Sequence, residues 1–162
     1  MIRLVPKKLR ELNRHLFAET TFDSFLVPEA HFVTAFRTDF TGQLPPASRD
    51  EAESSEAPSA APACVSWQEL RPYALQLVRG TQAPKSYSVV LKLPEDKTAA
   101  LAAAAPGADP DDVSGLYLNI RYAKEEVSVT TGCTLKIFSL DKSWEKVWDS
   151  RVEEWFSRLG LI

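Results

Sequence analysis

The segment at residues 144–162 constrains the fold more than any other part of this chain. Aromatic and aliphatic side chains recur there at steps of three and four residues, the spacing that places side chains on one face of an α-helix. Because each aromatic side chain buries about 150–250 Å², such a helix must pack against a broad apolar surface, and a β-sheet fits best. The stripe consists of Trp144, Val147, Trp148, Arg151, Val152, Trp155, Phe156 and Leu159.

Alternation of apolar and polar residues predicts the strands of that sheet. A short edge strand is expected at residues 2–5, and a longer strand over residues 31–41. Another alternating run predicts a central strand at residues 86–93. From there, residues 116–138 alternate in a way that predicts a three-stranded meander, with Gly132 in a turn or a bulge.

Three helices are expected before the C-terminal one. The first lies at residues 7–17, where leucines form an apolar stripe. The second begins at Ser66 and stops before Gly80, and Pro72 either divides it or kinks it. The third lies at residues 94–105, an acidic first turn followed by an alanine run.

The order of these elements sets the fold class. It favours an α+β fold, with a mostly antiparallel sheet, helices packed on one face and an amphipathic, tryptophan-rich helix at the C-terminus. A length of 162 residues suits one domain, so we expect residues 1–162 to form a single domain. Residues 44–63 are rich in Ala, Pro, Ser and Glu, a composition that predicts a disordered surface insert.

Charge and composition exclude several classes of partner. The net charge of −3 argues against a nucleic-acid or anionic-membrane binder, which would carry a basic excess. Residues 1–12 are charged and lack a long apolar run, so we expect neither a signal peptide nor a membrane span. Cys64 and Cys133 stand far apart without a CxxC motif, which predicts free thiols and no zinc site. The expected compartment is the cytoplasm.

Side chains that commonly catalyse reactions are sparse. His15 and His31 are the two histidines, and neither lies in a recognisable motif. The glycines form neither GxGxxG nor GxxxxGK[ST], so we expect no nucleotide hydrolysis and no cofactor. Three aspartates between residues 109 and 112 lack the rest of an EF-hand pattern, so no metal site is predicted. Enzymatic activity stays undecided, and a non-enzymatic role is favoured.

The polar side of the predicted meander is the first candidate binding surface. If the helices cover one side of the sheet, the other side presents aromatic, amide, hydroxyl and cationic groups, which is the composition of a recognition surface. The alternative is a solvated face with ordinary cross-strand pairs. The candidate ligand-binding residues are Tyr117, Asn119, Arg121, Thr130, Lys136 and Phe138.

A second candidate is the loop at residues 79–87. Arg79 and Lys85 lie there around a glycine and a proline, and they are candidate contacts for an anion such as phosphate. The alternative is a helix stop followed by a rigid turn into the next strand.

Four sequence blocks carry a resemblance to a known family. They are FDSFLV at residues 22–27, LRPYALQLVRGTQAPKSYSVVLKL at residues 70–93, SGLYLNIRY at residues 114–122 and TGCTLKIFSLDKSWEKVWD at residues 131–149. The chain resembles a family of small uncharacterised bacterial proteins, a domain of unknown function found mainly in clostridia-like Firmicutes. It departs from that family at residues 45–63. The resemblance implies one domain and a bacterial origin, and it carries over no catalytic residue.

Two functions of different class stay open. The first is a non-enzymatic intracellular binding or protein-interaction domain that uses the open sheet face to hold a protein partner or a second copy of the chain. The second is a small enzyme or an anionic-ligand site for a nucleotide or phosphate around that face, with Arg121 and Lys136 as contacts. Stacking of single-stranded nucleic acid on Tyr117 and Phe138 is a third hypothesis, which the negative net charge disfavours.

Overall fold

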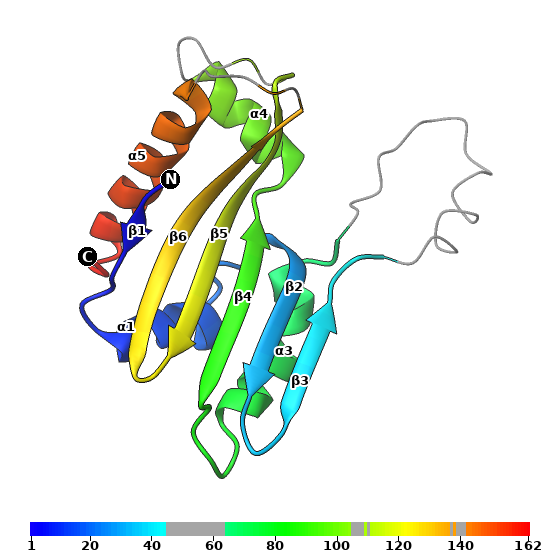
Figure 1. Ribbon diagram of the computed structural model, residues 1–162, viewed down its shortest axis with the longest axis vertical. Helices are drawn as coiled ribbons and strands as arrows, with labels where there is room; N and C mark the ends of the chain where they lie inside the picture. Colours follow the sequence, from blue (N-terminus) through cyan, green and yellow to red (C-terminus); the bar gives the residue numbers. More distant parts are fainter. Residues whose placement is uncertain (45–63, 105–108, 110, 137, 139–141) are drawn as a thin grey trace, which may run out of the picture.

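One six-stranded sheet organises the protein. The computed structural model describes residues 1–44, 64–104, 109, 111–136, 138 and 142–162, so the insert expected at 44–63 lies outside the described residues except for Leu44. The strands lie in the order β1-β6-β5-β4-β2-β3, with every neighbouring pair antiparallel (Figure 1). The strands are β1 (Arg3–Leu4), β2 (Leu26–Val33), β3 (Arg37–Thr41), β4 (Ser86–Lys92), β5 (Val113–Ala123) and β6 (Glu126–Leu135).

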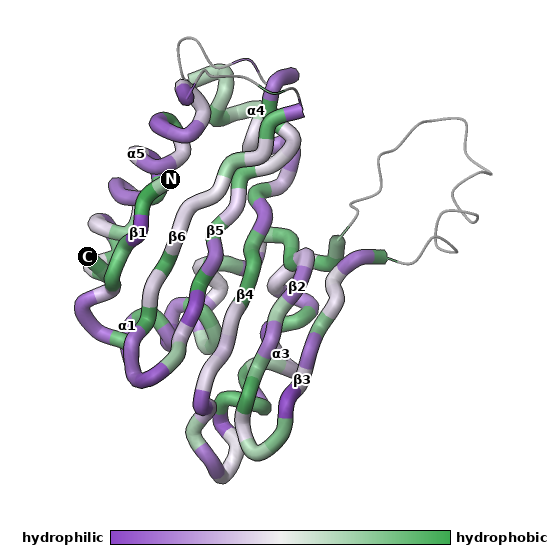
Figure 2. Tube along the Cα trace, in the orientation of Figure 1, coloured by the Kyte–Doolittle hydropathy of each residue, from purple (hydrophilic) through white to green (hydrophobic). Residues whose placement is uncertain are grey.

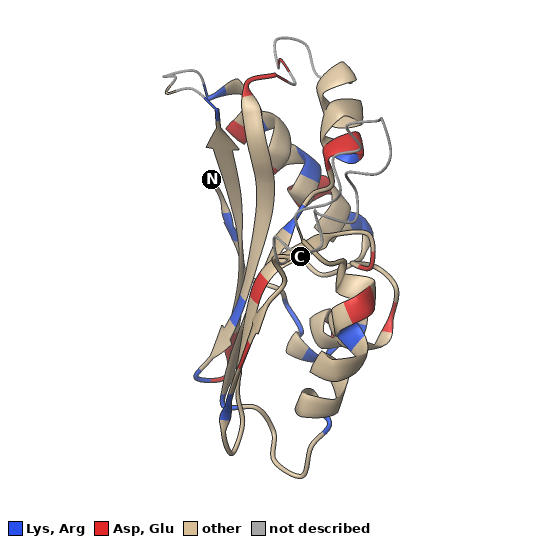
Figure 3. Cartoon of the chain, turned by 90° about the vertical axis from the view of Figure 1, so that its right-hand side faces the viewer, with Lys and Arg blue, Asp and Glu red and all other residues tan. Residues whose placement is uncertain are grey.

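The described helices all pack on one side of this sheet, which leaves the other side uncovered (Figure 3). The predicted α+β class, with an antiparallel sheet and helices on one face, is therefore confirmed. No helix among the described residues combines the length and the apolar character needed to cross a bilayer. The helices are α1 (Leu9–Asn13), the π-helical turn η1 (Arg14–Ala18), α3 (Trp67–Val78), α4 (Glu95–Ala103) and α5 (Ser143–Arg158).

The tryptophan-rich helix α5 packs as its stripe predicts. Trp144, Trp148, Val152 and Phe156 are buried, each one turn after the last. The indole Nε1 of Trp148 donates a 2.9 Å hydrogen bond to the backbone carbonyl of Tyr117 on β5. Because the polar end of this indole is satisfied, the aromatic body is buried without the cost of an unpaired N–H.

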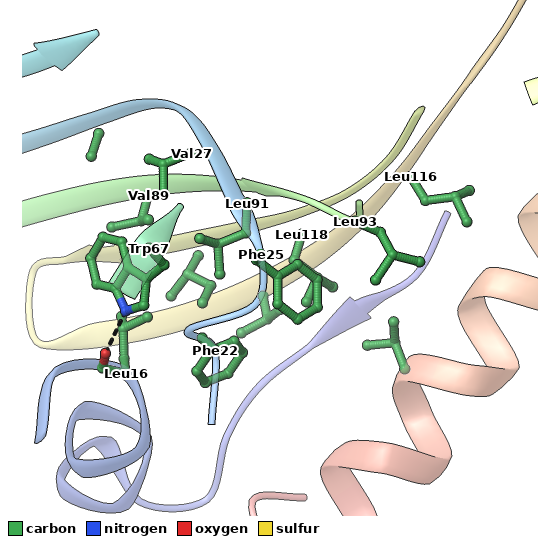
Figure 4. Packing of buried hydrophobic residues seen from close by; sticks show 14 of the residues in the cluster. Leu16, Phe22, Phe25, Val27, Trp67, Val89, Leu91, Leu93, Leu116 and Leu118 are labelled. Carbon is green, nitrogen blue, oxygen red and sulfur yellow. Dashed lines mark hydrogen bonds between the residues drawn. The ribbon is translucent and has the colours of Figure 1, made fainter. Parts of the chain in front are cut away.

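A second tryptophan joins α3 to the N-terminal helices. Trp67 is fully buried, and its Nε1 donates a 2.7 Å hydrogen bond to the carbonyl of Leu16 in η1 (Figure 4). Its ring lies against Phe17, with the ring centroids 6.0 Å apart. Phe22 and Phe25 line the same core next to Leu91 and Leu118 of the central strands (Figure 4).

The strand expected over residues 31–41 is in fact a β-hairpin. β2 runs to Val33 and β3 starts at Arg37, so His31 pairs with Asp39 and Phe32 pairs with Thr38. The tight turn between the strands is closed by the Thr34 amide, which donates to the carbonyl of Phe36 at 2.9 Å. The alternation of side chains continues across this turn, and therefore periodicity alone did not reveal the reversal.

The predicted three-stranded meander contains two long strands. β6 runs without interruption through Gly132, which pairs with Tyr117 of β5. The prediction of a turn or bulge at Gly132 is therefore wrong. Val127, Val129 and Thr131 are buried in turn, so the alternation of β6 remains in register up to Gly132. Figure 2 marks the hydropathy of each residue along the strands.

Helix α3 also differs in detail from the prediction. It continues through Pro72, whereas the sequence left open a division at this residue. Tyr73, expected on the buried stripe, has 64% of its surface exposed. Ser66 is the N-cap residue, but its side chain makes no capping hydrogen bond.

Tyr87 is a buried polar group in the central strand β4. Its hydroxyl donates a 2.5 Å hydrogen bond to Oδ1 of Asn13 in α1. Burial raises the pKa of the Tyr87 phenol well above its ordinary value of 10.0. Burial likewise raises the pKa of the Cys64 and Cys133 thiols above their ordinary value of 9.0.

These raised pKa values predict that the fold loses stability at alkaline pH. Below the unfolded-state pKa values, about 9 for the two thiols and about 10 for the phenol, these groups are protonated in both states and contribute no pH dependence. As the pH rises past these values, the unfolded chain loses its protons more readily than the folded chain, so the free energy of unfolding falls. We expect the urea midpoint to decline from about pH 9 upward. The variant Tyr87→Phe should make that decline shallower, and a midpoint that rises over this range would contradict the assignment.

Candidate binding face

The uncovered side of the sheet presents polar side chains from every strand. On β5, Tyr117, Asn119 and Arg121 alternate with the buried Leu118 and Ile120, which places them on this side. We call this surface the open face. Cross-strand pairing assigns to it Arg3, Glu29, His31, Val33, Arg37, Asp39, Thr41, Ser86, Ser88, Val90, Lys92, Tyr117, Asn119, Arg121, Ser128, Thr130 and Gly132.

Tyr117 forms a flat aromatic platform on the open face. A Cβ atom built on Gly115 would lie 2.7 Å from the ring, so the ring rests directly against the backbone of this glycine. Across the ladder, Gly132 has no side chain beside the Cβ of Tyr117 and the amide of Asn119. Gly115 therefore makes room for the aromatic ring itself, and Gly132 leaves the position beside Tyr117 and Asn119 without a side chain.

Polar groups surround this platform in register. Asn119 pairs with Thr130 of β6, and Lys92 of β4 pairs with Tyr117 itself. Arg121 lies one step further along β5, between Ser88 and Ser128. The amide, hydroxyl and cationic groups that the sequence placed on one side of the meander therefore lie together, and Lys92 adds a second cation.

The hairpin brings a histidine and an aspartate to the same face. The Nδ1 atom of His31 lies 2.7 Å from Oδ1 of Asp39, and Arg37 donates to both carboxylate oxygens of Asp39 at 3.0 Å. Hydrogen bonds from His31 and Arg37 lower the pKa of the Asp39 carboxyl from its ordinary value. Ser88 stands opposite His31 on β4. Sequence reasoning missed this cluster because it treated residues 31–41 as one strand.

Lys136 and Phe138 lie away from the centre of the open face. Lys136 follows the end of β6, and its backbone amide donates to the carbonyl of Asp112 at 2.8 Å. Arg121 lies towards the opposite end of the β5–β6 ribbon, where it pairs with Ser128. The described residues therefore do not bring Arg121 and Lys136 together as joint anion contacts. Phe138 is 92% exposed.

The structure also separates the two candidate anion contacts of the loop before β4. Arg79 lines a hollow with Arg10 and Arg14 of the N-terminal helices. Lys85 is exposed beside β2, where its backbone amide donates to the carbonyl of Val33 at 2.8 Å. Lys85 is not among the residues that line the Arg79 hollow.

Among the residues that the structure describes, no three histidine, cysteine or acidic side chains form a group that could hold a metal ion. The two cysteines are free thiols, with Cys64 buried and Cys133 partly exposed. His15 hydrogen-bonds Thr21 at 3.0 Å and pairs with Glu19 at 2.7 Å, which gives it a local structural role at the end of η1.

The architecture defines an α+β protein in which the described helices cover one face of an antiparallel sheet and leave the other face uncovered. The chain belongs to a family of unknown function (DUF5721), whose model matches residues 15–161. This confirms the resemblance to a domain of unknown function. No curated protein and no solved structure matches the chain.

Proposed function

We propose that this protein is a non-enzymatic binding domain that holds a protein partner, or a second copy of itself, on the open face. The observation that carries this proposal is the bare side of the six-stranded sheet, because the described helices pack on the opposite side (Figure 3). Two free thiols support a reducing compartment such as the bacterial cytoplasm. A bound partner would cover the open face of the sheet.

The composition of the face supports protein recognition. Tyr117 offers a large ring that is already held in place by contact with Gly115, so little side-chain entropy is lost on binding. Around it, Asn119, Arg121 and Thr130 offer hydrogen-bond donors and acceptors. Tyrosine and arginine are among the residue types that most often dominate the binding energy of protein interfaces.

The charges of the face favour a partner with charges of both signs. Arg3, Lys92 and Arg121 lie on β1, β4 and β5. Glu29 and Asp39 lie on β2 and β3, where Arg37 pairs with Asp39 and leaves an acidic excess of one charge. A second copy turned by a two-fold axis would place the cationic part of one face over the acidic part of the other. The enzyme or anion-site alternative has less support, because the described residues do not unite Arg121 with Lys136.

A photo-reactive residue tests the proposal directly. We expect benzoylphenylalanine in place of Asn119 to give covalent adducts of defined mass in the cells that make the protein. The same group in place of Tyr73, which is 64% exposed on the helical side, is the matched control. The adducts should disappear when Arg121→Glu is added. Identical adducts at both positions, or none at Asn119, would contradict the proposal.

A further inference from the structure

A groove lies on the helical side of the protein, between α4, α5 and the turn before β2. Its volume is about 480 Å³, within the range of small-molecule sites. The indole of Trp155 stacks on the ring of Phe25, with centroids 5.8 Å apart and an interplanar angle of 15°. These two rings form part of an apolar floor that consists of Phe25, Leu93, Leu101, Trp148, Val152 and Trp155.

Three cations stand around this apolar floor. They are Lys97 of α4, together with Arg151 and Arg158 of α5. Arg158 binds Glu154 at 2.6 Å, and Arg151 reaches the same carboxylate only at 3.8 Å. Glu154 is the one described carboxylate within ion-pairing distance of these cations, so the rim carries a positive excess in a chain whose net charge is −3.

The ammonium of Lys97 is held by a neutral partner. Its Nζ donates a 2.6 Å hydrogen bond to the hydroxyl of Ser24, and no described carboxylate lies within ion-pairing distance. Ser24 and Thr21 bring two hydroxyls to the same rim. Cations and hydroxyls beside a buried apolar floor are complementary to a ligand with an anionic head and an apolar body.

A second hollow, of about 360 Å³, adjoins the groove along α4 and α5 and shares Leu101 and Arg151 with it. Ala104 and Val147 add apolar lining there, beside the polar Lys146, Ser150 and Glu154. An extended chain fits two adjoining hollows better than a compact ring system does.

We propose that this groove binds a free aliphatic carboxylate, with its chain on the floor and its carboxylate between Arg151, Lys97 and Arg158. The site is independent of the open face, because it is lined by α4 and α5 and the helices lie on the other side of the sheet (Figure 3). The carboxylate of the ligand is recognised by charge and hydrogen bonding, and its aliphatic chain by burial of apolar surface.

Titration of the purified protein with dodecanoate tests this site, with tryptophan fluorescence as the readout because Trp148 and Trp155 line the groove. We expect saturable binding below the concentration at which dodecanoate forms micelles. Dodecyltrimethylammonium has the same chain and the opposite charge, and it should bind at least about tenfold more weakly. Equal responses to the two probes, or no saturable response to dodecanoate, would overturn the proposal.

Two pairs of variants locate the site. Ala100→Phe fills the groove and should abolish dodecanoate binding, whereas Ala99→Phe, its neighbour on α4 that lines a different hollow, should leave it unchanged. Arg151→Gln should weaken binding about tenfold, and Lys85→Gln, at the far end of β4, should have no effect. Unchanged binding in both Ala100→Phe and Arg151→Gln would overturn the assignment to this groove.

Discussion

Replacing Gly42 with alanine is expected to lower the free energy of unfolding by about 3 kcal/mol or more. A Cβ atom at this position would lie far inside van der Waals contact with the carbonyl oxygen of Val27. The backbone cannot shift easily, because Gly42 donates to the carbonyl of Pro28 at 3.0 Å and accepts from the amide of Val65 at 2.8 Å. The clash would separate the end of β3 from β2.

Urea unfolding followed by circular dichroism measures this effect, and Gly80→Ala is the matched control. A Cβ atom on Gly80 would come no closer than 3.4 Å to another atom, the carbonyl oxygen of Leu77. We expect this variant to stay within about 0.5 kcal/mol of the wild type. Equal midpoints for Gly42→Ala and the wild type would show that the approach of β3 to β2 described here is wrong.

The second large effect is expected for Trp148→Ala, at about 3–5 kcal/mol of unfolding free energy. Trp148 is 3% exposed, so its removal leaves a large cavity between α5 and the sheet. The change also removes the N–H that donates to the carbonyl of Tyr117. The loss of this hydrogen bond adds to the cost of the cavity.

Trp155→Ala provides the comparison within the same helix. Trp155 is only partly buried at the edge of the core, where it stacks on Phe25. Its replacement should therefore cost less than that of Trp148, because less apolar surface is lost from the interior. If the urea midpoints of the two variants fell equally, or if that of Trp148→Ala did not move, the placement of α5 on the sheet would be contradicted.

The sequence predicted those elements whose periodicity is strong and local. The stripe of α5 and the alternation of β4 and β5 identified both the elements and the sides they bury. The hairpin of β2 and β3 was missed, because a three-residue turn preserves the alternation on both sides. The sequence placed Tyr73 on the buried stripe of α3, whereas the structure exposes this side chain.

Only those parts of the candidate site that lie within one strand could be predicted from the sequence. The side of β5 that carries Tyr117, Asn119 and Arg121 follows from alternation alone. Their neighbours Lys92 and Ser88 come from β4, and this register is set by pairing between distant segments. The groove between α4 and α5 escaped prediction for the same reason, since its lining comes from three separate parts of the chain.

The most direct test of the open face as a binding surface is oxidative footprinting of Tyr117. Hydroxyl radicals label aromatic side chains according to their exposure, and Tyr117 is partly exposed. Its labelling can be compared between the protein in the cells that make it and the dilute purified protein. We predict that Tyr117 is protected in cells, while the exposed Tyr73 on the helical side is labelled equally in both samples. Equal labelling of Tyr117 in the two samples would contradict the proposal, because it would show that nothing covers this face.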